Sequence, residues 1–107
     1  MKLLQTRKLN GVQLNIYEDD EDVWVTRQSL GEILGYENPT AAIEKIHEEH
    51  KERLDKFSKV CQIPDKNETT TFYSFKGVLE TCRWSHRPEA NDIFDGATSL
   101  VGGIFNG

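Results

Sequence analysis

Hydrophobic and polar side chains alternate over residues 11–25 in the pattern of a β-hairpin. Val12, Leu14 and Ile16 occupy every second position, and apolar residues return at 23–25 after a run of charged residues. A period of two places such side chains on one face of a half-buried strand. The pattern therefore predicts two antiparallel strands joined by the charged run between them.

A short helix is predicted directly after this hairpin. Thr26 is a good N-cap, because its hydroxyl can accept a backbone N–H of the first helical turn. Leu30, Ile33 and Leu34 follow at helical spacing and form one apolar face. Gly35 then ends the helix, since glycine readily takes the left-handed conformation found just beyond a helix.

A second helix is predicted to begin soon after that stop. Asn38 is placed as its N-cap and Pro39 as its first residue, where the missing N–H of proline costs nothing. Ile43 and Ile46 continue its apolar face, and the helix is expected to reach about Leu54. The opposite face, which carries mostly glutamates, is expected to point outward.

The two helices together have the outline of a helix-turn-helix unit. Gly31 lies where they would cross, and a small residue there lets the helices approach closely. The next apolar pair, Ile43 and Ile46, comes two residues later than a compact DNA-binding motif would place it. Both a DNA-binding unit and a plain αα-hairpin therefore fit the pattern.

The second half of the chain repeats this order of elements without repeating its sequence. Strands are expected over residues 57–63 and 69–73, with turn-forming residues between them. Ser74 is placed as the N-cap of a third helix, and Pro88 opens a fourth. The predicted order is ββααββαα, which makes residues 1–107 a single α+β domain.

The last two helices have apolar faces at helical spacing. The third is expected to bury Phe75, Val78, Leu79 and Cys82. The fourth continues to the end of the sequence through Ala90, Ile93, Phe94, Ala97, Val101, Ile104 and Phe105. Glycines weaken this last stretch, so it is expected either to fray or to pack against a partner.

The charge of the chain limits its partners. The formal net charge is −5, and residues 18–22 alone supply five negative charges. This run is either a solvated hairpin tip or a phosphate mimic that engages a basic partner. Without it the chain is neutral, so the protein lacks the overall basicity of a strong non-specific DNA binder.

Motifs typical of enzymes are weak. His47 and His50 lie three residues apart, whereas the helical zinc motif needs four, so His47 is expected to be half-buried and His50 solvated. Cys82 lies on an apolar helix face, which favours a buried structural thiol over a nucleophile. The sequence thus predicts no enzymatic activity, no catalytic residue, no metal and no cofactor.

The location is expected to be the cytoplasm. Cys61 and Cys82 are too few for a disulfide framework, so their thiols are expected to be reduced. No stretch resembles a signal peptide or a membrane span.

Basic residues fall into two groups. The first consists of Arg27 with Lys51, Arg53, Lys56 and Lys59. The second surrounds Trp84 and consists of Arg83, His86 and Arg87. Cations beside an indole suit phosphate contacts and base stacking. The alternative is that the tryptophan belongs to the core and the two arginines pair with Glu80 and Glu89.

Two segments carry a family pattern. They are VWVTRQSLGEILGYENPTAAI at 23–43 and FYSFKGVLETCRWSHRPEA at 72–90. The positions that match are Val23, Trp24, Leu30, Leu34, Gly35, Tyr36, Asn38, Pro39, Tyr73, Arg87, Pro88, Glu89 and Ala90. With LGYxNP and the distant RPEA step, the chain resembles the N-terminal domain of viral BRO proteins and phage antirepressors over roughly residues 10–95.

The resemblance implies a small α+β module of viral or prophage regulators that is often DNA-binding and commonly precedes a separate C-terminal domain. Its implied function is control of viral or lysogenic gene expression in the manner of an antirepressor, with double-stranded DNA or a repressor protein as partner. If the module binds DNA, the candidate contacts near the groove are Arg27, Thr40 and Lys45, with Arg83 and Arg87 on the backbone.

The alternative function is a protein-interaction module. It would capture a repressor or another DNA-binding protein through the acidic hairpin, with Asp19, Asp20 and Asp22 as contacts, and through the apolar C-terminal helix. A homodimer is compatible with either function.

Overall fold

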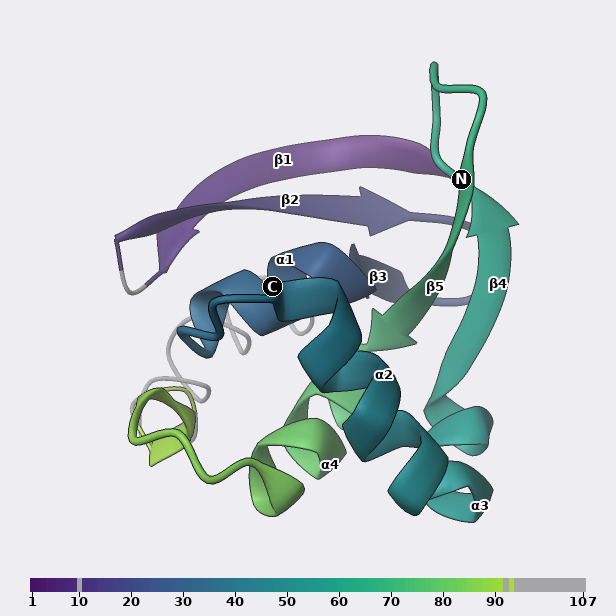
Figure 1. Cartoon of the computed structure of the whole chain (residues 1–107). Coiled ribbons are helices and arrows are strands. Elements are labelled where there is room, and N and C mark those ends of the chain that lie inside the picture. Colours follow the sequence, from purple (N-terminus) through teal and green to yellow (C-terminus); the bar gives the residue numbers. More distant parts are fainter. Residues whose placement is uncertain (10, 92, 94–107) are drawn as a thin grey trace.

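Five antiparallel strands form one curved sheet among the residues that the structure describes, which are 1–9, 11–91 and 93 of a computed structural model (Figure 1). The strands are β1 (Lys2–Leu9), β2 (Val12–Glu18), β3 (Val23–Thr26), β4 (Ser58–Gln62) and β5 (Thr69–Ser74), in the spatial order β1-β2-β3-β5-β4. The helices are α1 (Arg27–Ile33), α2 (Pro39–Glu49), α3 (Lys51–Leu54) and α4 (Phe75–Trp84), with a 3₁₀ turn, η1 (Asp55–Phe57), after α3. The expected α+β class is confirmed, although the order of elements differs in two places.

The first difference is β1, an edge strand that the hydrophobic pattern did not predict. It pairs with β2 from Lys2 opposite Glu18 to Leu9 opposite Val12. None of its side chains is buried. A strand that buries neither face has no reason to alternate polar and apolar residues, so its sequence carries no strand pattern.

The second difference is a break in the second helix, which was expected to run to Leu54 without interruption. α2 ends at Glu49, and His50 has φ −129° and ψ 38°, outside the helical region, before α3 begins. Pro39 is the first residue of α2, as predicted, but the side chain of Asn38 makes no capping hydrogen bond. The second helix therefore begins at the expected residue but ends at Glu49 instead of Leu54.

The other local predictions for helix ends are confirmed. Thr26 Oγ1 accepts a hydrogen bond from the backbone N–H of Ser29 at 3.1 Å. Gly35 has φ +79°, the left-handed conformation expected after α1. Ser74 Oγ likewise accepts from the backbone N–H of Gly77 at 3.4 Å and caps α4. Single residues thus decide where these helices begin and end.

α1 and α2 cross at Gly31, as the sequence predicted. A Cβ at this buried position would lie 2.6 Å from the carbonyl carbon of Pro39, closer than real side-chain carbons come. The two helices can therefore reach this separation only when residue 31 has no side chain.

Apolar side chains are buried on both faces of the sheet. The main core lies between the sheet and the helices, and its most buried members include Leu30, Ile33, Leu34, Ile43, Leu54 and Tyr73. A smaller cluster contains Tyr17, Trp24 and Phe72. Phe72 and Tyr73 are neighbours in one strand and belong to different clusters, so the clusters lie on opposite faces.

The third helix buries only part of the face that was expected. Val78 and Cys82 are buried, whereas Phe75 and Leu79 are half-buried. Burial raises the pKa of the Cys82 thiol to about 12, which fits the predicted structural role. Both cysteines are free thiols.

The start of the predicted fourth helix is described and the remainder is not. Residues 89–91 are helical, and Ala90 and Ile93 are buried in the main core. Residues 94–105 of this predicted helix lie outside the described residues.

Candidate functional site

The two segments that carry the family resemblance contact each other. The hydroxyls of Tyr36 and Ser85 are 2.8 Å apart, and Arg87 Nε donates to the carbonyl oxygen of Leu34 at 3.4 Å. A Cβ on Gly35 would collide with the Glu89 carboxylate. The arginine thereby places a positive charge at the C-terminal end of α1, where the helix carries partial negative charge. The LGYENP and RPEA motifs are two halves of one packed contact.

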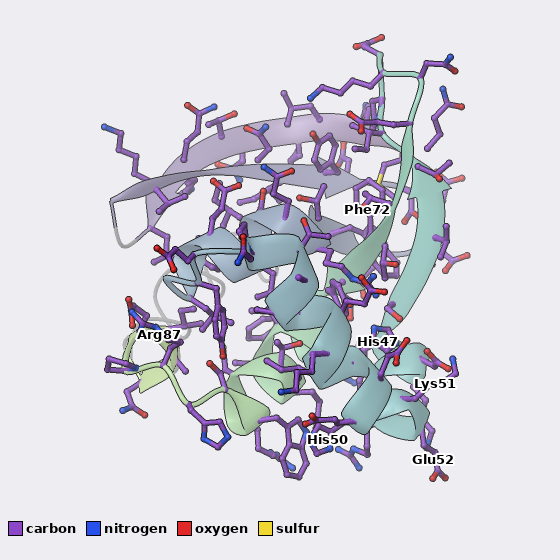
Figure 2. All side chains as sticks on the ribbon, in the orientation of Figure 1. His47, His50, Lys51, Glu52, Phe72 and Arg87 are labelled. Atoms are coloured by element: carbon purple, nitrogen blue, oxygen red, sulfur yellow. The ribbon has the colours of Figure 1, made fainter. Side chains whose placement is uncertain are left out.

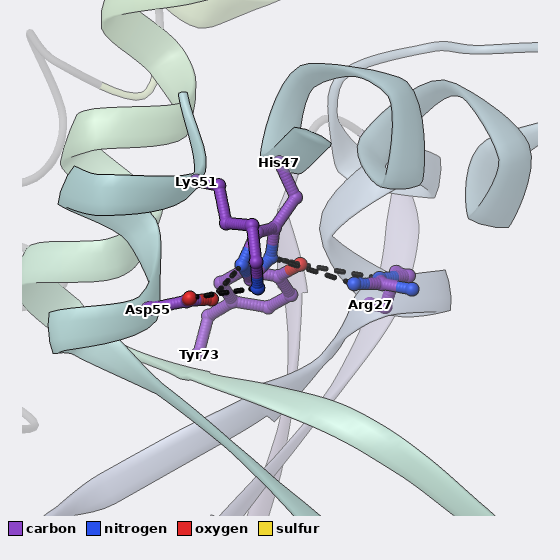
Figure 3. Close-up of polar contacts among 5 residues, drawn as sticks. All are labelled: Arg27, His47, Lys51, Asp55 and Tyr73. Atoms are coloured by element: carbon purple, nitrogen blue, oxygen red, sulfur yellow. Dashed lines mark hydrogen bonds and ion pairs between the residues drawn. The ribbon is translucent and has the colours of Figure 1, made fainter. Parts of the chain in front are cut away.

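A connected polar network joins α1, α2, α3, η1 and β5 (Figure 3). Arg27 Nε donates to Tyr73 OH at 3.1 Å, and His47 Nδ1 lies 2.7 Å from the same hydroxyl. His47 Nε2 lies 2.7 Å from Asp55 Oδ1, and Lys51 Nζ donates to Asp55 Oδ2 at 2.8 Å. His47 is 6% exposed and Tyr73 is fully buried, so these bonds replace hydrogen bonds to water.

The donors and acceptors of this network pair correctly when Nε2 of His47 carries a hydrogen. The Asp55 carboxylate accepts from Nε2–H of His47, which leaves Nδ1 to accept the Tyr73 proton. Burial raises the pKa of Tyr73, so the phenol stays protonated and can donate. The hydrogen bond from Lys51 has the largest effect on Asp55 and lowers its pKa, and the hydrogen bond from His47 lowers it further. The network holds α1 and α2 against the sheet, and His47 is buried rather than half-buried as expected.

His50 and Trp84 form a stack at the surface. Their ring centroids are 3.8 Å apart and their planes differ by 11°. Trp84 is 36% exposed, so its interpretation as a core residue is wrong, and His50 is half-buried against it rather than solvated. Within the described part of the chain, no group of three His, Cys, Asp or Glu residues is arranged to hold a metal ion.

Three of the five residues predicted to contact DNA are bound within the protein. Arg27 belongs to the network just described. Arg83 Nη1 lies 3.7 Å from Glu80 Oε1, and Arg87 Nη2 lies 3.1 Å from Glu89 Oε2. The alternative prediction for these two arginines, pairing with the neighbouring glutamates, is confirmed. Figure 2 places Arg87 far from His47, and Arg27 Nη2 lies 3.4 Å from His47 Nδ1, so Arg27 and Arg87 do not form one surface.

The other two predicted DNA contacts are exposed on α2. Thr40 lies in its first turn, and Lys45 lies further along, with no ion pair to any described residue. The neighbours of Lys45 on the same exposed face are Glu44, Glu48 and Glu49. The flank of α2 is therefore negative overall and would repel a phosphate backbone.

The acidic turn between β2 and β3 is partly internal. Asp19 Oδ1 accepts hydrogen bonds from the backbone N–H groups of Glu21 and Asp22 and from Trp24 Nε1, at 2.9 to 3.0 Å. Its other oxygen is bound by Lys59, whose ammonium lies 4.5 Å from the centre of the Trp24 ring. Partial burial opposes ionisation, but the bonds from Lys59 and Trp24 hold the pKa of Asp19 far below its usual range.

Asp20 and Asp22 differ from Asp19 in exposure. Both are exposed, although Asp22 also accepts a hydrogen bond from the backbone N–H of Val23 at 2.8 Å. Of the three residues predicted to bind a partner, Asp19 therefore has a structural role, and the turn is held in place rather than simply solvated.

A polar groove of about 360 Å³ is lined by residues of β2, of the junction between β3 and α1, of α2 and of the β4–β5 hairpin. We call it the interhairpin groove. Its polar lining includes Gln13 and Asn15 of β2, Gln28 and Ser29 of α1, Thr40 of α2, and Lys66 of the β4–β5 turn. Amides and hydroxyls thus outnumber charged groups there, although Glu32 and Glu68 also line it.

Two lysines stand beside this groove. Lys8 is opposite Gln13 in the ladder between β1 and β2, so its side chain lies on the same face of the ribbon. Lys66 lies on the other side, in the turn between β4 and β5. Both are exposed, and neither forms an ion pair with a described residue. They are therefore available to an external anion.

The acidic turn lies at the other end of β2 and β3 from this groove. Asn15 and Thr26 are the groove residues of these strands nearest the turn, and about 10 Å of strand separates each from it. This is about one Debye length, so salt weakens the repulsion between the turn and an anion in the groove.

The sequence did not single out the groove. Gln13 and Asn15 were recognised only as the polar positions that alternate with Val12, Leu14 and Ile16, and Gln28 was not singled out. Of the predicted contacts, Thr40 alone lies in the groove. The feature that could have indicated it is the clustering of neutral amides on exposed positions around a helix start, where charged residues are the commoner choice.

Comparisons of this chain with protein-family models, with curated proteins and with solved structures find no match. Among the described helices, none combines the length and apolar character that crossing a membrane requires.

Proposed function

We propose that this chain is a phage or prophage regulatory module of the antirepressor type that binds double-stranded DNA through the interhairpin groove. The observation that carries the proposal is the set of amide and hydroxyl side chains that line this groove, to which α2 contributes Thr40 of its first turn. In helix-turn-helix proteins, the first residues of the second helix contact base edges in the major groove. Asn, Gln, Ser and Thr are side chains that hydrogen-bond to those edges.

The two flanking lysines supply phosphate contacts in this proposal. Lys8 and Lys66 lie on opposite sides of the groove, each on its own β-hairpin. Two phosphate contacts give a shallow salt dependence, because each contributes about one unit to the slope of log affinity against log salt. A chain with a net charge of −5 is therefore expected to bind weakly and to depend on base contacts for its specificity.

The first test is the salt dependence of binding to duplex DNA, measured by fluorescence anisotropy. Lys8→Ala and Lys66→Ala should each weaken binding on all sequences alike and lower the salt slope by about one unit. Lys76→Ala is the matched control, because Lys76 is exposed on α4 and lies outside the groove. If the control and the two groove variants behave alike, DNA does not occupy this groove.

A second test asks whether Arg87 stabilises the fold or contacts DNA directly. Arg87→Ala should lower the free energy of unfolding by about 1 kcal/mol, because it removes the bond to Leu34 O and the Glu89 ion pair. The salt slope of DNA binding should stay as in the unaltered protein, since this guanidinium is bound internally. Chemical denaturation and anisotropy measure the two effects. A lowered slope with unchanged stability would place Arg87 on the DNA backbone.

The second candidate function is capture of a repressor or another DNA-binding protein. One observation favours it: Glu44, Glu48 and Glu49 form an exposed acidic face on α2. Proteins that bind DNA carry basic surfaces, and this face is complementary to them. A purified phage repressor that binds this protein, and loses its operator on doing so, would support capture.

A further inference from the structure

A hollow of about 340 Å³ opens between the edge of β4 and the exposed side of α2. Val60 and Thr71 line it from the sheet, and Glu44 and Glu48 line it from α2. β4 is the last strand of the sheet, so among the described residues its outer edge has no partner strand. Val60 is 71% exposed at this edge. The free N–H and C=O groups of an edge strand can bind another extended segment.

The cations that line this hollow are bound within the protein. Arg27 takes part in the network of Figure 3, and Lys51 donates to Asp55 in the same network. Lys59 binds Asp19 on the other side of the strand. The charges of Lys51 and Lys59 are therefore neutralised by carboxylates, whereas Arg27 is held by the neutral Tyr73 hydroxyl and keeps its charge.

Unlike the two lysines, the two glutamates that line the hollow are not paired with an opposite charge among the described residues. Glu44 and Glu48 are exposed, and no cation of the described residues forms an ion pair with either. They lie four residues apart on α2, where like charges face each other and repel. Both also line the adjacent hollow on α2 together with Glu49. Two negative charges and the one positive charge of Arg27 are left without an ion pair among the described residues that line this hollow, so the surplus is negative. A cation placed between the two glutamates would relieve their repulsion.

We propose that the edge of β4 and the adjoining face of α2 bind an extended basic segment of a partner protein. The segment adds to the sheet beside β4 and places a lysine or arginine between Glu44 and Glu48. This surface deepens the second candidate function and rests on it, because a basic arm is a common feature of proteins that bind nucleic acid. It shares no lining residue with the interhairpin groove.

The charge requirement is tested with two fluorescent nine-residue peptides, one alternating lysine with threonine and the other alternating glutamate with threonine. The lysine peptide should bind the full chain and the glutamate peptide should not. Glu44→Gln combined with Glu48→Gln should weaken binding roughly five- to tenfold, because each exposed ion pair contributes a few-fold. Equal binding of the two peptides would overturn the proposal.

The matched control is Glu52→Gln, which removes the same charge from α3. Glu52 is exposed and lies outside the hollow (Figure 2). Its substitution should change the affinity of the lysine peptide less than twofold. An equal loss for Glu52→Gln and the double variant would mean that general charge attraction, rather than this surface, holds the peptide.

Strand addition is tested by methylating alternate backbone nitrogens of the lysine peptide. A strand turns successive N–H groups to opposite sides, so one set of methylations should abolish binding and the other should leave it within about threefold. Two methylated peptides that both bind normally would overturn strand addition. A rise in the mass of the free protein with concentration, abolished by the double glutamate variant, would identify a second copy as the occupant and overturn a basic partner.

Separate measurements test the β4–α2 surface and the capture of a repressor independently. DNA binding by the groove should not weaken in the double glutamate variant, because the two surfaces share no residue and the change only removes repulsion of phosphate. If a purified phage repressor binds equally well to this variant, capture stands and the surface is wrong. If the peptide results hold and no repressor binds, the surface stands and capture is wrong.

Discussion

Replacing Gly31 by alanine is expected to lower the free energy of unfolding by about 3 kcal/mol. The added Cβ would meet backbone atoms of Pro39, which cannot rotate away as a side chain can. Either α1 or α2 then has to shift, and the residues packed at their crossing lose contact. Denaturant unfolding should show the loss directly. The melting temperature should fall by more than about 10 °C in a domain of this size.

Gly11→Ala is the control for this prediction. Gly11 has φ +77°, so alanine is strained there, but an added Cβ would have no atom within 4 Å. The expected cost is about 1 kcal/mol, from the left-handed conformation alone. Gly35→Ala should fall between the two, since its Cβ would meet the Glu89 side chain, which can move. If Gly31→Ala costs no more than Gly11→Ala, the two helices are further apart than the structure shows.

Much of the fold could be predicted because it depends on residues that act on their immediate neighbours. Thr26 and Ser74 cap helices through their own hydroxyls, and Gly35 ends a helix through its own backbone. The crossing at Gly31 was also recognisable, because a small residue between two apolar faces has few other uses.

What the sequence could not predict depends on residues that are distant in the chain. β1 is held by pairing with β2 and carries no apolar pattern of its own. The break at His50 coincides with its stacking on Trp84, 34 positions away. Neither partner can be identified from local spacing, because local spacing describes one element at a time.

The candidate site shows the same limit. Arg27 and Arg87 were predicted as DNA contacts because they are cations near helix ends. Whether a cation is free depends on which acceptors the fold brings to it, and here Tyr73 and Leu34 O come from other elements. The groove could not be assembled from the sequence either, because its walls come from two hairpins and two helices.

The second large effect concerns Asp19. Asp19→Asn is expected to lower the free energy of unfolding by about 2 kcal/mol at neutral pH. Asparagine can still accept the backbone and indole N–H groups with its one oxygen. Its amide, however, would turn an N–H donor toward the Lys59 ammonium, which then loses its counter-charge in a half-buried position. Asp20→Asn, which changes an exposed carboxylate in the same turn, should cost less than about 0.5 kcal/mol.

The pH dependence of unfolding gives a second measure of Asp19. The pKa of this carboxyl is lowered in the folded protein, with Lys59 and Trp24 bound to its ionised form. Its contribution to stability is therefore complete above the unfolded pKa, near 3.9, and is lost as the pH falls toward the lower native value. Below about pH 4 the unaltered protein and Asp20→Asn should lose stability steeply. Asp19→Asn should lose less over the same interval, because it has already lost this contribution at neutral pH. Parallel curves for all three proteins in that interval would show that Asp19 does not hold the turn through its charge.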